Sequence, residues 1–160
     1  MDFTVITSGT EETQRLGRQL GELLRGGDLV CLFGELGSGK TAFAQGVGKA
    51  LEVQEPLTSP TFTLIQEYAA KAGGEIIRLV HMDLYRLKHP EEAEIIGVTD
   101  QFQEDRICLI EWPEIALQMF PEDRVDIFIE GNGDLPRRIH VRSNSAEWLE
   151  RLIQLSGGQK

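Results

Sequence analysis

The sequence predicts an α/β protein in three layers, with helices on both faces of a central sheet that mixes parallel and antiparallel strands. Buried apolar runs such as residues 28–33 are followed by amphipathic patterns, as in parallel strand–helix units. Pairs of β-rich runs joined by short glycine turns, as in residues 60–87, instead indicate antiparallel hairpins. Since the connections are short, we expect a single domain over residues 1–160.

The first half of the chain alternates strand and helix patterns. The expected order is a strand at 2–7, a helix within 8–27, a buried strand at 28–33 and a helix at 40–51. Ser8 and Glu11 have the spacing of a capping box at the start of the first helix, and Thr10 is an alternative cap. Gly26 and Gly27 are expected to end that helix.

The second half adds two hairpins with a buried strand between them. The expected order is a hairpin within 60–87 that turns at 72–74, a short helix within 89–98 beginning at Pro90, a strand at 106–112, a helical turn at 113–119, a hairpin at 124–142 that turns at 131–134, a helix at 145–155 and an irregular tail at 156–160. The last helix is amphipathic, so we expect it to cover the sheet.

Composition argues against several kinds of function. The net charge is −10, and the largest basic group is Arg137–Arg138 with Arg142 nearby, so no surface is obvious for holding nucleic acid directly. No apolar run approaches the ~18 residues of a membrane span. The N-terminus lacks the features of a secretion signal, which favours the cytoplasm. Cys31 and Cys108 lie in separate apolar runs and are expected to be buried, without zinc or redox chemistry.

A glycine-rich segment between a buried strand and a helix carries the main functional signal. Residues 34–41 read G-E-L-G-S-G-K-T and match the phosphate-loop pattern G-x-x-x-x-G-K-[ST], typical of a P-loop NTPase-like fold. Glycines let backbone N–H groups point inward, and a helix start favours an anion. Lys40 is expected to reach the outer phosphates, and Thr41 to ligate Mg²⁺. The predicted nucleotide contacts here are Gly34, Glu35, Leu36, Gly37, Ser38, Gly39, Lys40, Thr41 and Ala42.

Hydrolysis requires an acid beside the phosphate loop, usually at the end of a neighbouring buried strand. Two apolar runs end in an acid, one at Asp83 and the other at Glu111. We assign Glu111 to Mg²⁺ through water and Asp83 to the attacking water or the outer metal shell, with the reverse assignment left open. Both acids join Lys40 in the predicted catalytic set. The segment around Thr61 is expected to close over a γ-phosphate as a switch segment.

The nucleotide and the type of reaction follow from motifs that are missing. No N-K-x-D sequence follows the glycine segment, which favours ATP over GTP. The 160 residues leave little room for a second substrate pocket, and only Arg137–Arg138 resembles part of a kinase lid. ATP hydrolysis that drives a partner is therefore favoured, with a small-molecule or nucleoside kinase as the alternative. His81, two residues before Asp83, is a weak metal candidate.

Several motifs occur together in a fixed order: G-E-L-G-S-G-K-T, S-P-T-F-T-L-I-Q-E-Y, H-M-D-L-Y-R-L, P-E-E-A-E-I-I-G and I-C-L-I-E-W-P-E. Their combination closely resembles the TsaE (formerly YjeE) family of small bacterial P-loop ATPases over residues 8–142. The resemblance implies ATP and Mg²⁺ as ligands. It also implies work with the TsaB–TsaD complex in N6-threonylcarbamoyladenosine modification of tRNA next to the anticodon. Those partners, rather than this chain, would hold the tRNA.

The resemblance also implies roles for individual residues. Lys40 would contact the phosphates, Thr41 would ligate Mg²⁺, and Asp83 and Glu111 would lie in the metal and hydrolysis site. The further residues implied to be functional are Trp112, Thr61, Tyr85, Arg86 and, as nucleotide contacts, Thr10 and Arg137. Many members have a second threonine after the position of Thr41, where this chain has Ala42, and the missing hydroxyl bears on nucleotide affinity.

Overall fold

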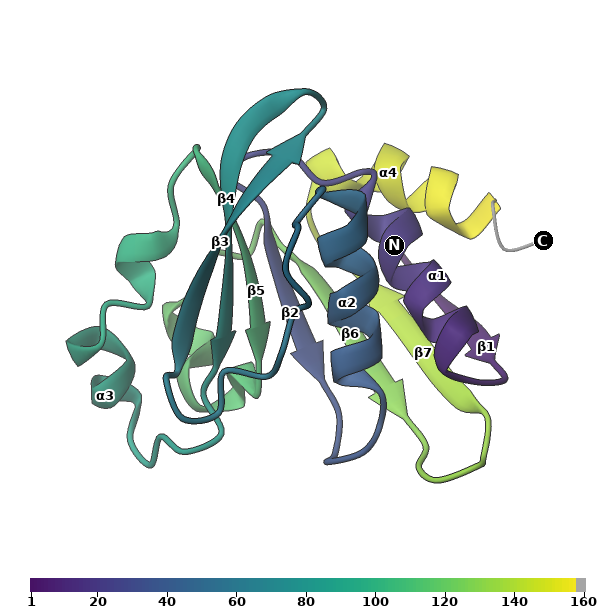
Figure 1. Ribbon diagram of the computed structural model, residues 1–160, viewed down its shortest axis with the longest axis horizontal. Coiled ribbons are helices and arrows are strands. Elements are labelled where there is room, and N and C mark those ends of the chain that lie inside the picture. The colour runs from purple at the N-terminus through teal and green to yellow at the C-terminus, as the bar shows by residue number, and fades with distance from the viewer. Residues whose placement is uncertain (158–160) are drawn as a thin grey trace.

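The computed structural model describes residues 1–157 and contains a seven-stranded sheet in the order β1-β7-β6-β2-β5-β4-β3 (Figure 1). The elements are β1 (Asp2–Thr7), α1 (Thr10–Gly21), β2 (Leu29–Phe33), α2 (Lys40–Ala50), β3 (Ile65–Ala72), β4 (Glu75–Asp83), α3 (Pro90–Ile95), η1 (Thr99–Gln101), β5 (Arg106–Glu111), η2 (Pro113–Met119), β6 (Val125–Glu130), β7 (Arg137–Arg142) and α4 (Ala146–Gly157). Here η1 and η2 are 3₁₀ helices.

The sheet is mixed, as the sequence predicts. Strand β2 pairs in parallel with β5 and β6, and β4 pairs in parallel with β5. The two hairpins, β3–β4 and β6–β7, are antiparallel, and β1 joins the free edge of β7 antiparallel to it. Because β2, β5 and β4 run parallel, their carboxyl ends lie together at one end of the strands, the lower end in Figure 1.

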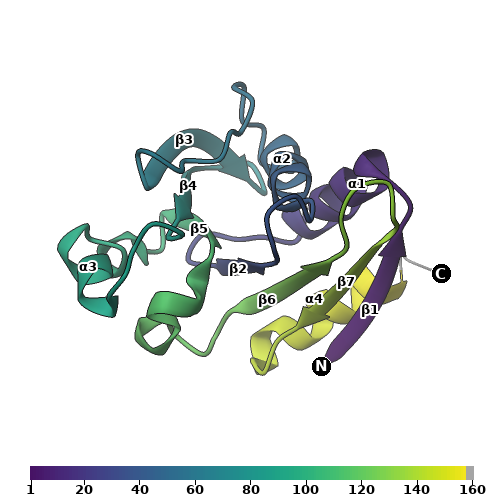
Figure 2. The same cartoon turned by 90° about the horizontal axis from the view of Figure 1, so that it is seen from below.

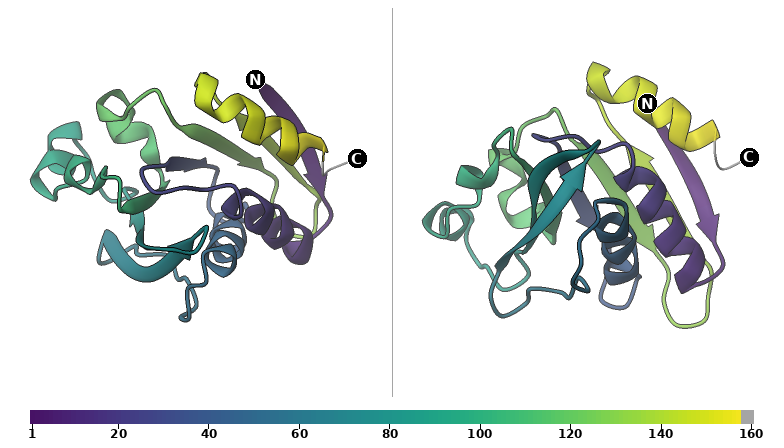
Figure 3. Two further views of the ribbon diagram at one scale, coloured as in Figure 1. Left: turned by 90° about the horizontal axis from the view of Figure 1, so that it is seen from above. Right: turned by 45° about the horizontal axis from the view of Figure 1, so that its top comes forward.

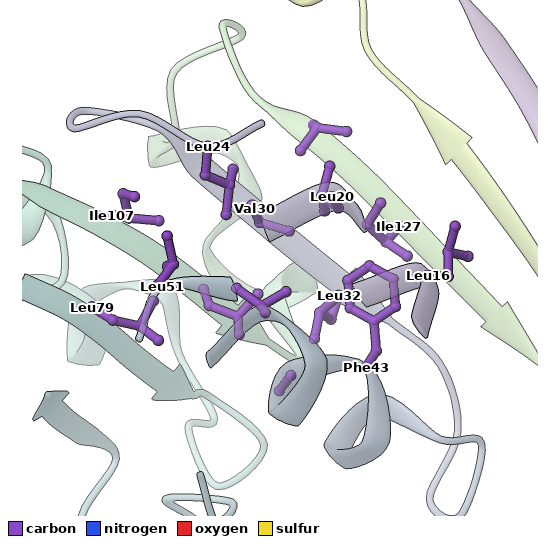
Figure 4. Packing of buried hydrophobic residues seen from close by; sticks show 14 of the residues in the cluster. Leu16, Leu20, Leu24, Val30, Leu32, Phe43, Leu51, Leu79, Ile107 and Ile127 are labelled. Carbon is purple, nitrogen blue, oxygen red and sulfur yellow. The ribbon is translucent and has the colours of Figure 1, made fainter. Parts of the chain in front are cut away.

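Alternation along β2 divides the core into two layers. Val30 and Leu32 join the cluster under α1 and α2 (Figure 4), whereas Leu29 and Cys31 face the cluster under α3 and η2. Figure 2 shows α1 and α2 together on one side of the sheet. Cys31 and Cys108 are both buried, as predicted, and burial raises the pKa of the thiol of Cys108 to about 12.

Helix α4 closes the end of the sheet opposite the glycine segment (Figure 3). Trp148, Leu152 and Leu155 complete the cluster under α1 and α2. The guanidinium of Arg151 pairs with the carboxylate of Asp28, just before β2 begins. The amphipathic pattern is thus satisfied by packing. The expected irregular tail is wrong for residues 156–157, which continue α4, and its remainder, 158–160, lies outside the described residues.

The first helix begins and ends differently from the prediction. Its N-cap is Gly9 in extended conformation, and neither Ser8 nor Thr10 caps it, because Thr10 is already helical. Ser8 instead bonds the carboxylate of Glu12 through its backbone N–H and its hydroxyl. The helix ends at Gly21, ahead of Gly26 and Gly27, because bonds of Leu23 to Leu20 and Leu24 to Gly21 tighten the chain into a turn.

Two glycines let α1 and α2 pack with almost no space between their backbones. A Cβ on Gly17 would lie 2.2 Å from the Phe43 carbonyl oxygen, and one on Gly46 would lie 2.0 Å from the Gln14 carbonyl oxygen. No side chain larger than hydrogen fits at either position. This contact fixes α2, and with it the glycine segment that leads into its first turn.

We expect Gly46→Ala to destabilise the protein by about 2 kcal/mol, because the added methyl group has to displace the backbone of α1. The midpoint of urea unfolding measures the loss. Gly157→Ala is the helical control, since a Cβ there meets no atom of the described residues within 4 Å, and it should change stability by less than about 0.5 kcal/mol. Equal midpoints for the two variants would contradict the close packing of α1 on α2.

Candidate functional site

The glycine loop, residues 34–41, connects β2 to α2 at the carboxyl edge of the sheet. Gly37 and Gly39 have φ of 79° and 112°, in the region that glycine adopts without strain. A Cβ on Gly34 would lie 2.7 Å from the carbonyl oxygen of Ile129, so this position is closed to larger residues as well. The loop therefore curls tightly over the N-terminus of α2, as its pattern predicts.

The Lys40 ammonium lies inside the curl of the loop. Its Nζ donates to the carbonyl oxygen of Gly34 at 2.5 Å and stands 3.6 Å from the centroid of the Trp112 ring. Burial lowers the pKa of Lys40, and the nearby carboxylates of Glu111 and Asp83 oppose that shift. The ammonium is thus held by neutral partners that a phosphate oxygen can replace.

Asp83 and Glu111 are neighbours across the β4–β5 pair. The parallel register places them directly opposite each other, and each is nearly fully buried. The Asp83 carboxylate accepts hydrogen bonds from the hydroxyls of Ser59 at 3.0 Å and Thr61 at 3.3 Å, and from the N–H of Tyr85 at 2.9 Å. Asp83 thereby ties the segment around Thr61 to the end of β4.

Glu111 has a partner that the sequence reasoning missed. Nε2 of His81 lies 2.6 Å from Oε2 of Glu111, and both side chains are buried. The available signal was the spacing of His81 and Asp83: residues two apart on a strand share a face. The contact itself depends on β5 lying beside β4, and local sequence patterns do not predict which strands are neighbours.

Trp112 leaves β5 in the left-handed region, with φ of 54°. Such a conformation costs a bulky residue ~1–2 kcal/mol. It turns the indole over Lys40 and against Tyr85, whose ring centroid is 4.7 Å away. Arg86, the other residue of the D-x-Y-R motif, lies over the ring of Phe62, at 4.6 Å from its centroid, and does not line the cavity at the glycine loop.

Arg137 clamps the glycine loop from the other side. Its Nε donates to the carbonyl oxygen of Ser38 at 2.7 Å, and its Nη2 to those of Gly37 at 3.3 Å and Gly133 at 3.1 Å. The residue belongs to β7, so its backbone is fixed in the sheet. This placement makes Arg137 a brace between two loops and does not give it the position of a mobile lid.

A cavity of about 470 Å³ opens where these groups meet. It is lined by Thr10, Leu36, Gly37, Gly39, Lys40, Thr41, Ser59, Thr61, Asp83, Tyr85, Glu111, Trp112 and Arg137. A smaller cavity of about 210 Å³ adjoins it through Thr10, Gly39 and Arg137, and Ala42 lines that part. Gly34, Glu35 and Ser38 face a separate hollow behind the loop. Most of the predicted site residues are therefore brought together, from six separate segments.

The oxygen groups of this cavity suit a hard cation that keeps several waters. Among residues 1–157 there is no cluster of three or more His, Cys, Asp or Glu side chains that could hold a metal alone. Thr41, Asp83 and Glu111 all line the cavity beside Lys40. Mg²⁺ is commonly bound by one or two such oxygen ligands together with phosphates and waters, so the residues present fit it.

Fold and cavity together define the class: a mixed-sheet α/β protein with a glycine loop that faces two buried acids. The family model of threonylcarbamoyl adenosine biosynthesis protein TsaE matches residues 7–139. The chain belongs to the TsaE family.

Relatives and a solved structure agree with this assignment. The tRNA threonylcarbamoyladenosine biosynthesis protein TsaE of Bacillus subtilis is 35% identical over 83% of this chain and 80% of its own length. The protein of the same name from Treponema pallidum is 37% identical over 85% of this chain and 97% of its own length. The crystal structure of Bacillus subtilis YdiB superposes with a TM-score of 0.78 at 28% identity, covering 100% of this chain and 97% of that one. No helix in the described part of the chain is long and apolar enough to cross a membrane.

We expect Arg137→Gln to destabilise the protein by about 1–2 kcal/mol, because the clamp on the carbonyl groups of the glycine loop is lost. Arg138→Gln is the matched control, since Arg138 is exposed on the same strand and makes no comparable contact. Urea unfolding measures stability, and hydrogen exchange of residues 36–39 should become faster only in Arg137→Gln. Identical exchange rates in the two variants would show that Arg137 does not hold the glycine loop in place.

Proposed function

We propose that this chain binds ATP with Mg²⁺ in the larger cavity, hydrolyses it, and uses the reaction to act on the TsaB–TsaD complex in tRNA threonylcarbamoyladenosine biosynthesis. The observation that carries the proposal is the pairing of Asp83 with Glu111 directly beside Lys40 and Thr41. A phosphate loop alone can bind a nucleotide, whereas two buried acids beside it can also position a cation and the attacking water. The names of the relatives support the pathway.

The glycine loop would cradle the phosphates through its backbone N–H groups and the start of α2. Lys40 would exchange the carbonyl oxygen of Gly34 and the indole of Trp112 for phosphate oxygens, which are charged and therefore stronger acceptors. The smaller cavity, lined by Thr10 and Ala42, would take the nucleoside end. Because Ala42 has no hydroxyl, this side of the nucleotide would rest on backbone groups and on Arg137.

The two acids would divide the remaining work. Thr41 would hold Mg²⁺ directly and Glu111 through water, since one oxygen of Glu111 is already bonded to His81. Bound Mg²⁺ supplies positive charge against the β- and γ-phosphates. Asp83 would orient the attacking water together with the hydroxyl of Thr61. Attack at the γ-phosphorus breaks its bond to the β–γ bridging oxygen, and ADP and phosphate leave with release of one proton.

Lys40→Ala should lower the rate of phosphate release from ATP by about 100-fold or more, because a preorganised positive charge at the transferred phosphoryl group is lost. Lys49→Ala is the control, an exposed lysine in the last turn of the same helix. Phosphate release with Mg²⁺ present, measured alone and with TsaB–TsaD and tRNA, is the test. Phosphate release at the wild-type rate in Lys40→Ala would show that the proposed cavity is not the site of hydrolysis.

The same experiment separates hydrolysis from phosphoryl transfer to a metabolite. ADP and free phosphate should form in equal amounts without any added acceptor. ADP that appears only with an acceptor, together with a phosphorylated product, would instead make the chain a kinase. The fixed position of Arg137 in β7 favours hydrolysis, since a kinase lid has to move.

Exposed apolar side chains around the mouth of the cavity support a protein partner there. Leu36, Phe62, Tyr85 and Leu135 are 67%, 83%, 51% and 64% exposed. Leu36 and Tyr85 line the larger cavity and Leu135 the smaller one, while Phe62 directly follows Thr61, which lines the larger cavity. We call these four side chains the apolar rim. Large apolar side chains gathered at one place mark interaction surfaces. The net charge of −10 favours a partner, rather than this chain, as the holder of tRNA.

Phe62→Ser should weaken binding to the TsaB–TsaD complex by about tenfold or more, because a large aromatic side chain of the apolar rim is lost. Ile76→Ser is the matched control: Ile76 is likewise 83% exposed but lies in the β3–β4 hairpin away from the cavities. Titration calorimetry with a non-hydrolysable ATP analogue measures both affinities. An equal effect of the two substitutions would show that the apolar rim is not the docking surface.

A further inference from the structure

His81 forms a buried pair with Glu111, but the proposed function gives this histidine no contact with the nucleotide or the metal. Nε2 of His81 lies 2.6 Å from Oε2 of Glu111, with side-chain exposures of 1% and 3%. His81 does not line the cavity, whereas Glu111 does. The histidine therefore reaches the site only through the carboxylate.

The strand register explains how this contact arises. His81 pairs with Leu109 in the parallel register, two residues before the pair of Asp83 and Glu111. His81 and Asp83 share a face of β4, so the imidazole lies just inside the edge that carries the acids. Glu111 presents Oε2 to this ring, and the same side chain also lines the cavity.

The chemistry of the two groups determines which atom donates and which accepts in the hydrogen bond between His81 and Glu111. An ionised carboxylate only accepts, so Nε2 of His81 carries the proton and donates. Nδ1 of His81 is buried and has no partner among the described residues. As a bare acceptor, Nδ1 is left with an unpaired lone pair, which is tolerated more often than an unpaired N–H donor. His81 thus offers Glu111 a single fixed donor at Nε2.

We propose that His81 is a positioning residue, which fixes the carboxylate of Glu111 so that only one oxygen faces the metal and its water. This inference rests on the proposed function, since it assigns His81 to the metal side of the same site. Hydrogen bonds from buried groups to the carboxylates around a metal orient them, and their loss typically weakens metal binding by about 10- to 100-fold.

The test compares two substitutions that place an amide at different ring positions. In His81→Gln the amide nitrogen falls near Nε2 and can still donate to Glu111, whereas in His81→Asn it falls near Nδ1 and cannot. Binding of Mn²⁺ to the complex of the protein with ADP is followed by electron paramagnetic resonance of the free aqueous ion. Tyr68→Phe is the control, because its buried hydroxyl on the neighbouring strand also has no hydrogen-bond partner within residues 1–157.

We expect His81→Asn to weaken Mn²⁺ binding by about tenfold or more, and His81→Gln and Tyr68→Phe to stay near wild type. The affinity for ADP without metal should not change in any variant, and urea unfolding identifies the folded ones. Equal Mn²⁺ binding in wild type and His81→Asn, or equal losses in His81→Asn and His81→Gln, would overturn the role of His81. Failure of the wild-type protein to bind Mn²⁺ with ADP would instead overturn the proposed function itself.

Discussion

The parallel pairing of β4 with β5 is the constraint on which the rest of the site depends. It sets Asp83 beside Glu111 at the edge of the sheet where β2 passes into the glycine loop. Side chains alternate along a strand, so a slip of one residue would turn an acid to the opposite face. The β3–β4 hairpin holds the register from the outer side, since its pairing runs without interruption from Ile65 to Ala72. The distant glycine loop and the acids are therefore aligned by backbone hydrogen bonds.

The buried ionisable side chains of the site are each held by a group other than one another's. Lys40 binds a carbonyl oxygen and an aromatic ring, Asp83 accepts from hydroxyls and an N–H, and Glu111 accepts from an imidazole. An unpaired charge in such a setting would be costly. If the three side chains instead formed ion pairs with one another, their charges would largely cancel, and little electrostatic attraction would remain for a ligand. These separate partners stabilise each side chain and leave it available, which is the arrangement that a phosphate and a cation require.

Local sequence predicted the parts of this site whose signals are local. The glycine loop follows from its own spacing, and Asp83 and Glu111 follow from apolar runs that end in an acid. The contacts that depend on tertiary pairing were not predictable in this way. Arg137 meets Ser38 across 99 residues, and His81 meets Glu111 only because β4 and β5 are neighbours. The prediction for the start of α1 failed for a different reason: two successive glutamates, Glu11 and Glu12, follow Ser8, and spacing alone did not show that Ser8 bonds Glu12.

Trp112 joins the phosphate site to the surface through a strained backbone. Its left-handed conformation persists because the indole gains contacts with both Lys40 and Tyr85. Tyr85 is half exposed and belongs to the apolar rim, so the tilted ring pair of Tyr85 and Trp112 links this rim to the ammonium that would hold the phosphates. A nucleotide that draws Lys40 away removes one of these contacts of the indole. Under the proposed function, nucleotide state and partner contact are therefore coupled through Trp112, by direct side-chain contact and without a change in the sheet.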